Sequence, residues 1–243
     1  RDSSYRSIFR WGDPAFFKYP KESLYKMMKE AFHMTDEDFR DYTDDIGFDQ
    51  VSLPDHPSRI APEHLEALKK IVGKEFVTTG DYERLSVAYG CTGYDLLRLR
   101  HKQIDSLPDV VVYPDTTEQV EELVHYAAEH KLPLYVYGGG SSVTRGVEPI
   151  KGGISLDMRK RFNKILSFNE VDQTITVQAG LSGPALEEAL QDAPNRFGAK
   201  RQYTCGHFPQ SFEYSSVGGW VVTRGAGQNS TYYGTIADIV LSQ

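Results

Sequence analysis

Three consecutive glycines, Gly138 to Gly140, follow an apolar run at 134–137 and are followed by two serines. Glycine backbone can approach a ligand closely and adopt left-handed conformations, so that successive N–H groups converge on an anion. Val143 stands where G-x-G-x-x-G requires its third glycine, and no G-x-x-x-x-G-K-[ST] is present. The pattern therefore predicts a phosphate or pyrophosphate site built from loop amides. The alternative is a plain tight connection between strands.

A second stretch, residues 204–227, is also dense in small and hydroxyl side chains. Gly218 and Gly219 would allow a helix to begin hard against a ligand, with Arg224 more than one turn further on. Long ordered loops in compact domains are usually functional, although a packed helix after a glycine-rich loop is the simpler alternative. Two such stretches on one frame suit a large, extended cofactor that carries a diphosphate.

From residue 109 onward the pattern alternates between strands and helices. Five apolar runs predict strands, the last two of them as a hairpin: 110–113, 134–137, 154–158, 165–168 and 174–178. Thr116 and Gln119 form a capping box for one helix, and Ser182 caps another. Strands dominate after the glycine loop, which indicates an α+β fold with the ligand at the carboxyl end of the second strand.

Residues 1–106 have a different pattern and are expected to form a mainly helical N-terminal extension. Apolar residues at helical spacing predict helices from Lys21 to about His33 and after Pro62, and Asp81 is expected to cap the next helix. An aromatic segment at 10–19 is expected to be a packed arm, and the acidic stretch at 36–49 a solvated helix and turn.

Composition excludes several classes of protein. The formal net charge of −7 over 243 residues and the lack of a long basic run argue against nucleic acid as a partner. The only two cysteines, Cys91 and Cys205, lack the spacing of a disulfide framework or a metal site. No signal peptide or membrane span is indicated. The chain begins at Arg1 and ends within a strand-like run at 239–243, so a piece of a longer protein is expected.

The order of these elements resembles the PCMH-type FAD-binding domain of the vanillyl-alcohol-oxidase superfamily, which has two α/β subdomains. One branch, the alkyldihydroxyacetonephosphate synthases, is more similar. Its motifs are matched by Trp11-Gly12 with Phe16-Phe17, by 107–114, by Gly206-His207, by Ser211-Phe-Glu-Tyr-Ser215 and by Val217-Gly-Gly-Trp-Val-Val-Thr-Arg224. The resemblance covers nearly the whole chain and assigns residues 107–243 to the FAD-binding domain.

The resemblance implies three groups of FAD-binding residues. The pyrophosphate is assigned to Tyr137, Gly138, Gly139, Gly140, Ser141, Ser142 and Val143. The ribityl chain and the isoalloxazine are assigned to Gln210, Ser211, Phe212, Glu213, Tyr214, Ser215 and Ser216, and to Thr223, Arg224, Gly225 and Ala226. Three positions depart from the family pattern: Gln210 replaces a common Asp, Ser141 a common Thr, and Gly225-Ala226 a more usual Ala-Ser.

For function, the resemblance implies exchange of the acyl chain of acyl-dihydroxyacetone phosphate for a fatty alcohol, a transferase step in ether lipid biosynthesis. The family's proton-transferring residues lie downstream, so no catalytic residue is expected in this chain. Because residues 134–146 contain no histidine, the FAD is expected to be non-covalent, with His207 as a hydrogen-bonding loop residue. Two alternatives remain open: an FAD-linked oxidase or dehydrogenase of a 2-hydroxy acid, and a non-enzymatic anion-binding module.

The same resemblance gives expectations for the whole protein. Its substrate would be a small molecule, lipid-like or a hydroxy acid, and its part beyond this chain would contact a membrane peripherally. A homodimer is expected, located in the cytoplasm or, in a eukaryote, in the peroxisome.

Overall fold

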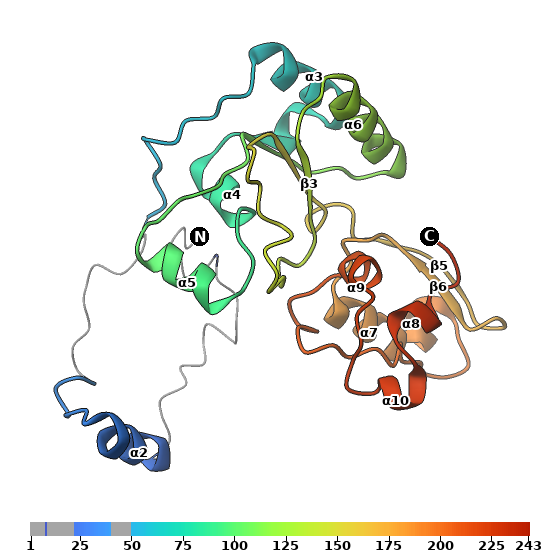
Figure 1. Cartoon of the computed structure of the whole chain (residues 1–243). Helices are drawn as coiled ribbons and strands as arrows, with labels where there is room; N and C mark the ends of the chain where they lie inside the picture. The colour runs from blue at the N-terminus through green and yellow to red at the C-terminus, as the bar shows by residue number, and fades with distance from the viewer. Residues whose placement is uncertain (1–7, 9–21, 40–49) are drawn as a thin grey trace.

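A computed structural model describes residues 8, 22–39 and 50–243 of the chain. Its elements divide between a four-stranded sheet with its helices and a two-stranded hairpin with further helices (Figure 1). The aromatic segment at 10–19 and most of the acidic stretch at 36–49 lie outside the described residues. Within the described part, no helix has both the length and the apolar character that crossing a membrane requires.

The larger sheet has the strand order β1-β2-β4-β3. Its strands are β1 (Val77–Thr78), β2 (Val110–Val112), β3 (Leu134–Tyr137) and β4 (Ile154–Asp157). β2, β4 and β3 run parallel, and β1 pairs with β2 antiparallel. In the register of β3 with β4, Tyr137 lies opposite Asp157. The three strands predicted at 110–158 are thus confirmed, and their carboxyl ends meet at one edge, where the glycine loop leaves Tyr137.

Helices α3 (Pro62–Val72) and α6 (Thr117–Glu129) pack together against one face of this sheet (Figure 1). Leu68 and Leu123 are fully buried there with the inward side chains of β2 and β4. The Thr116 hydroxyl caps α6 as expected, but the Gln119 side chain accepts a hydrogen bond from the Asp115 amide instead of the Thr116 amide. The burial of the helix stripes follows from their spacing, because every third or fourth residue faces the sheet.

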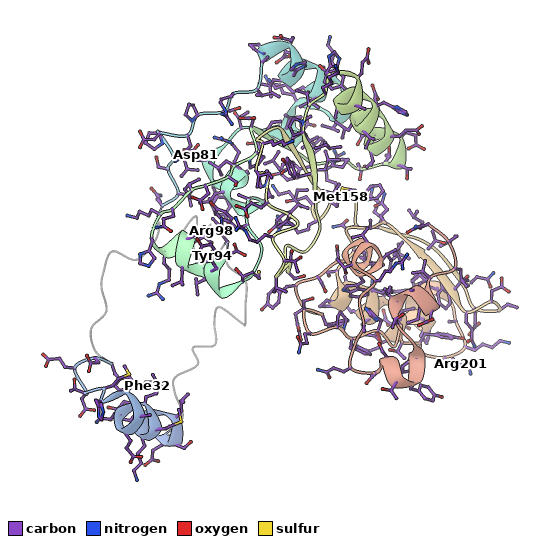
Figure 2. The ribbon with its side chains drawn as sticks, in the orientation of Figure 1. Phe32, Asp81, Tyr94, Arg98, Met158 and Arg201 are labelled. Carbon is purple, nitrogen blue, oxygen red and sulfur yellow. The ribbon has the colours of Figure 1, made fainter. Side chains whose placement is uncertain are left out.

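After the short 3-10 turn η1 (Lys74–Phe76) come α4 (Asp81–Ser86), which contacts β2, and α5 (Gly93–Arg100). Leu85 of α4 and Leu99 of α5 are buried in a second apolar cluster. The expectation that Asp81 caps α4 is wrong, because Gly80 is the N-cap and Asp81 is the first helical residue. The Asp81 carboxylate instead accepts a hydrogen bond from the amide of Leu53, 28 residues earlier (Figure 2). The Asp81 carboxylate, which the local pattern assigns to capping, therefore forms a long-range contact instead.

The predicted extension contributes directly to this sheet. β1 forms an edge strand and α3 supplies core residues, although both precede residue 107. The boundary at 107 stays a prediction. The helix expected from Lys21 is confirmed over its described part as α2 (Glu22–Phe32), none of whose residues is buried.

The second region is built on the predicted hairpin, which is confirmed as β5 (Ile165–Asn169) paired with β6 (Thr174–Val177). Its helices are α7 (Gly183–Gln191), α8 (Ala193–Phe197), α9 (Val217–Thr223), α10 (Ser230–Tyr233) and α11 (Ile236–Ile239). Leu181, Leu186, Leu190, Trp220 and Ile236 form its core. Ser182 caps α7 as expected. The strand-like run at 239–243 forms no strand, because α11 extends to Ile239 and the residues after it pair with no described strand.

Candidate functional site

The two glycine-rich stretches, predicted from distant parts of the sequence, meet in the structure. A Cβ atom at Gly139 would overlap the Tyr214 carbonyl oxygen and lie 2.5 Å from the Ser215 Cα. A Cβ at Gly138 would overlap the Ser216 hydroxyl. Only glycine permits this approach of two backbones. The loop after β3 and the segment before α9 therefore form one structural unit.

A cavity of about 340 Å³ opens where the two stretches meet. It is lined by Gly139, Arg159, Asn163, Gly180, Leu181, Ser182, Ala185, Glu213, Tyr214, Ser215 and Ser216. Its volume lies within the range of small-molecule sites, about 300–1,000 Å³. Five of the residues assigned to FAD by sequence thus line a common cavity: Gly139 and the run from Glu213 to Ser216.

The remaining assigned residues are not among those that line this cavity, and their surroundings differ. Ser141 and Ser142 are half-buried in the loop, and Val143 is exposed. Thr223, Arg224 and Ala226 are exposed at the end of α9, and Gly225 is half-buried. Arg224 has a left-handed backbone with φ 49° as the C-cap of α9. Gln210 is exposed and Ser211 is half-buried in the turn before Phe212. The contact of these side chains with a cofactor stays a prediction.

Several hydroxyl and aromatic groups of the second stretch are engaged in packing. The Trp220 indole N–H donates to the Ser215 hydroxyl over 2.6 Å, and the Ser216 hydroxyl caps α9 at the Gly219 amide. Phe212 stacks on Trp220, with ring centroids 6.2 Å apart. These contacts fix the segment that faces the glycine loop. The Ser215 and Ser216 hydroxyls therefore have a structural role in addition to their predicted role in FAD binding.

The predicted site residues do not include the segment that supports the glycine loop, Tyr89 to Cys91. The Cys91 amide donates to the Ser142 carbonyl over 2.8 Å, and its thiol donates to the Gly140 carbonyl over 3.2 Å. A Cβ at Gly90 would overlap the Ser142 carbonyl oxygen. A third close backbone approach thus fixes the loop, and it comes from residues assigned to the N-terminal extension. Gly90 was the one available signal.

A buried ionic cluster holds the far end of the loop at Glu148. Arg98, on α5, donates from Nη1 to Glu148 Oε1 over 2.8 Å and from Nη2 to Asp95 over 2.5 Å. All three side chains are 2% exposed or less. The Arg98 guanidinium also stacks over the rings of Tyr89, at 4.2 Å, and of Tyr94, at 5.2 Å (Figure 2). Arg98 therefore links both supports of the loop, Glu148 and the segment that begins at Tyr89.

The protonation of this cluster follows from its partners. Burial by itself raises the pKa of Glu148, but hydrogen bonds from Arg145, Arg98 and Ser106 outweigh it and lower that pKa to about 2. Glu148 is therefore ionised at neutral pH, and two guanidinium groups share its charge.

Arg159 is another residue at this edge that sequence reasoning missed. Its guanidinium lies 4.6 Å from the ring centroid of Tyr137 and is paired with Asp157 through Nη2 at 2.6 Å. Burial lowers the pKa of Arg159, but the hydrogen bond and charge of Asp157 raise it above its ordinary value. A permanent positive charge therefore lies beside the glycine loop.

His207 is buried to 1% exposure and packs edge-on against Trp220, with ring centroids 5.0 Å apart. The expected hydrogen bonding of its ring is not found, because neither ring nitrogen has a partner among the described residues. Burial lowers its pKa below the ordinary 6.5. The ring is therefore neutral at pH 7.

This depressed pKa predicts acid sensitivity. Below about pH 6.5, His207 binds a proton in the unfolded chain but stays neutral in the folded protein. The free energy of unfolding therefore decreases as the pH falls, by up to about 1.4 kcal/mol per pH unit. Replacement of His207 by Phe removes this contribution. Urea unfolding at pH 5.5 and 7.5 measures it: the pH-dependent loss should be smaller in His207→Phe than in the wild type. An equal loss in both would contradict the assignment.

Comparison with known proteins identifies the family of the chain. A family model described as FAD binding domain matches residues 108–243, so the chain belongs to the PCMH-type FAD-binding domain family. Alkyldihydroxyacetonephosphate synthase of Dictyostelium discoideum is 33% identical over 189 residues, which are 76% of this chain and 30% of that protein. The synthase of Trypanosoma brucei brucei is 31% identical, over 76% of this chain and 30% of that protein. The chain thus spans about a third of the length of these relatives.

A solved alkyldihydroxyacetonephosphate synthase structure has a TM-score of 0.69 and 33% identity, over 75% of this chain and 36% of that chain. A second protein is more distant. D-lactate dehydrogenase [cytochrome] 1 of Saccharomyces cerevisiae is 26% identical over 73% of this chain and 28% of that protein. The names of these relatives indicate more than one enzymatic activity.

Proposed function

We propose that this chain is the FAD-binding portion of an alkyldihydroxyacetonephosphate synthase-like flavoenzyme. That enzyme exchanges acyl for alkyl on acyl-dihydroxyacetone phosphate in ether lipid synthesis. The observation that carries the proposal is the close approach of Gly139 to the backbone of Tyr214 and Ser215, all of which line one cavity. The similarity to three synthases, at 31–36% identity, supports this branch of the family.

The donor set fits the diphosphate of FAD. Gly140 has φ 73°, and Gly138 and Gly139 leave no room for a side chain, so the loop presents backbone to the cavity. FAD supplies the redox-active ring that carries the chemistry, and the protein supplies position and exclusion of water. The loop amides would hold the pyrophosphate and residues 210–216 and 223–226 the rest of the cofactor, in an arrangement of two α/β subdomains.

Two features support a non-covalent cofactor. No histidine occurs in the glycine loop. His207 is buried against Trp220, and its ring nitrogens reach no described polar group. The catalytic acid and base groups would come from outside this chain, as the resemblance to the synthases implies.

An FAD-linked oxidase or dehydrogenase of a 2-hydroxy acid is the second candidate. The similarity to D-lactate dehydrogenase and to glycolate oxidase subunit GlcD of Bacillus subtilis, each 26% identical, favours it. The substrate is accordingly a lipid-like molecule or a hydroxy acid. We also propose a homodimer with peripheral membrane contact, located in the cytoplasm or, in a eukaryote, in the peroxisome.

Turnover by the full-length protein separates the two candidates. Purified protein loaded with FAD is incubated either with acyl-dihydroxyacetone phosphate and a labelled fatty alcohol or with a panel of 2-hydroxy acids and an artificial electron acceptor. Labelled alkyl product without reduction of the acceptor supports the synthase proposal. Acceptor reduction by a 2-hydroxy acid, with no alkyl product, would overturn it in favour of the second candidate.

A further inference from the structure

We propose that Arg159 supplies the positive charge that pairs with the diphosphate of the bound cofactor, and that Asp157 holds its guanidinium in place for this task. The inference rests on the proposed FAD binding and adds a residue that neither glycine-rich stretch contains. Four observations carry it: the place of Asp157 in the sheet, the grip on the guanidinium, the composition of the cavity and the absence of a helix after the loop.

Asp157 is placed by the sheet itself. It is the last residue of β4 and lies directly opposite Tyr137, the last residue of β3, from which the glycine loop departs. Its side chain is 2% exposed. A residue two positions further on, Arg159, therefore emerges at the same sheet edge as Gly138 and Gly139.

The guanidinium of Arg159 is held from two sides. Its Nε donates to Asp157 Oδ1 over 2.9 Å and its Nη2 to Oδ2 over 2.6 Å, a two-point grip that fixes the plane of the fork. The face of the guanidinium lies over the Tyr137 ring. Nη1 has no hydrogen-bond acceptor among the described residues, so the fork keeps donors for a ligand. The side chain is 20% exposed.

The cavity between the two stretches needs such a charge. Within the described part of the chain, Arg159 is the only basic residue that lines it, and Glu213 is the only acidic one. Arg159 also lines a neighbouring cavity of about 190 Å³ together with Asp157 and Tyr113. Its side chain is thus shared by the two cavities. A diphosphate brings two negative charges, and a planar guanidinium matches phosphate oxygens better than any other side chain.

The topology explains why the backbone amides of the glycine loop alone would bind a diphosphate weakly. In nucleotide sites of the common type, a helix begins after the glycine loop and its positive end faces the phosphate. Here the segment 138–153 leads to β4 and not to a helix, and its basic residues are Arg145, which pairs with Glu148, and the exposed Lys151. A side chain delivered by β4 replaces the contribution of the helix.

The test measures binding of FAD and of ADP to the full-length protein by isothermal calorimetry. Arg159→Gln is expected to weaken both ligands about 10- to 100-fold, the range for loss of one charge-assisted contact. Arg159→Lys should recover part of the loss, because it restores the charge without the fork. The salt dependence of the wild-type affinity should be steeper than that of Arg159→Gln.

Two further variants keep the result interpretable. Arg159→Gln leaves Asp157 buried without its cation, so the double variant Asp157→Asn with Arg159→Gln removes both charges. It should regain thermal stability and still bind FAD and ADP weakly. Lys160→Gln is the matched control: the adjacent residue loses the same charge, but its ammonium lies 3.8 Å from the ring centroid of Tyr113, and its affinity should stay within about twofold of wild type.

Wild-type affinity for FAD and ADP in both Arg159→Gln and the double variant overturns this inference and leaves the proposed function intact. An equal loss of FAD and ADP affinity in Lys160→Gln also overturns the inference, because the loss of any nearby positive charge would then explain the effect. A wild-type protein that takes up neither FAD nor ADP overturns the proposed function and this inference together.

Discussion

Replacement of Arg98 by Ala is expected to destabilise the protein by about 3–5 kcal/mol, the cost of leaving buried carboxylates without their cation. Asp95 and Glu148 are both buried, and each accepts a hydrogen bond from the Arg98 guanidinium. Its loss also removes the cation stacked over Tyr89. Urea unfolding of the full-length protein at pH 7 measures the effect.

The control for this variant is Arg100→Ala on the same helix, which forms no ion pair with a described residue. It should change the free energy of unfolding by about 0.5 kcal/mol or less. If the free energy of unfolding of Arg98→Ala also lies within about 0.5 kcal/mol of the wild-type value, the ionic cluster around Arg98 does not stabilise the glycine loop.

Replacement of Gly139 by Ala is expected to separate the glycine loop from residues 214–216. The added Cβ would overlap backbone atoms of Tyr214 and Ser215, which cannot rotate away as a side chain would. Overpacking of this kind costs about 1–3 kcal/mol, which corresponds to a loss of about 5- to 150-fold in affinity if the cost falls on the FAD-bound state. FAD affinity, measured by quenching of flavin fluorescence, reports the change.

Gly146→Ala is the matched control, because it lies in the same loop and its added Cβ would meet no atom within 4 Å. It should bind FAD as the wild type does. Equal affinity of Gly139→Ala and Gly146→Ala would show that the close approach of the two backbones is not needed for the cofactor.

Much of this arrangement could be predicted from the sequence because its signals are local. The run of Gly138 to Gly140, the strands on either side of it and the Ser182 cap each depend on residues within a few positions of one another. The meeting of the two glycine-rich stretches agrees with their composition, since glycine is the residue that two closely packed backbones require.

What the sequence could not show depends on contacts between distant residues. Arg98 reaches Glu148 across 50 positions, and Cys91 reaches Gly140 across 49. The local pattern predicts that Asp81 is a helix cap, because its distant partner, the Leu53 amide, leaves no signal near it in the sequence. His207 is predicted to be a hydrogen-bonding loop residue, yet its ring packs against the indole of Trp220.

Non-covalent FAD binding is tested most directly by the absorbance spectrum of the purified full-length protein, taken before and after acid precipitation. Flavin bands are expected on purification or after addition of FAD, and they should move entirely to the supernatant when the protein is precipitated. Bands that remain with the pellet would contradict the non-covalent cofactor. A protein with no flavin bands, before or after incubation with FAD, would contradict the cofactor site itself.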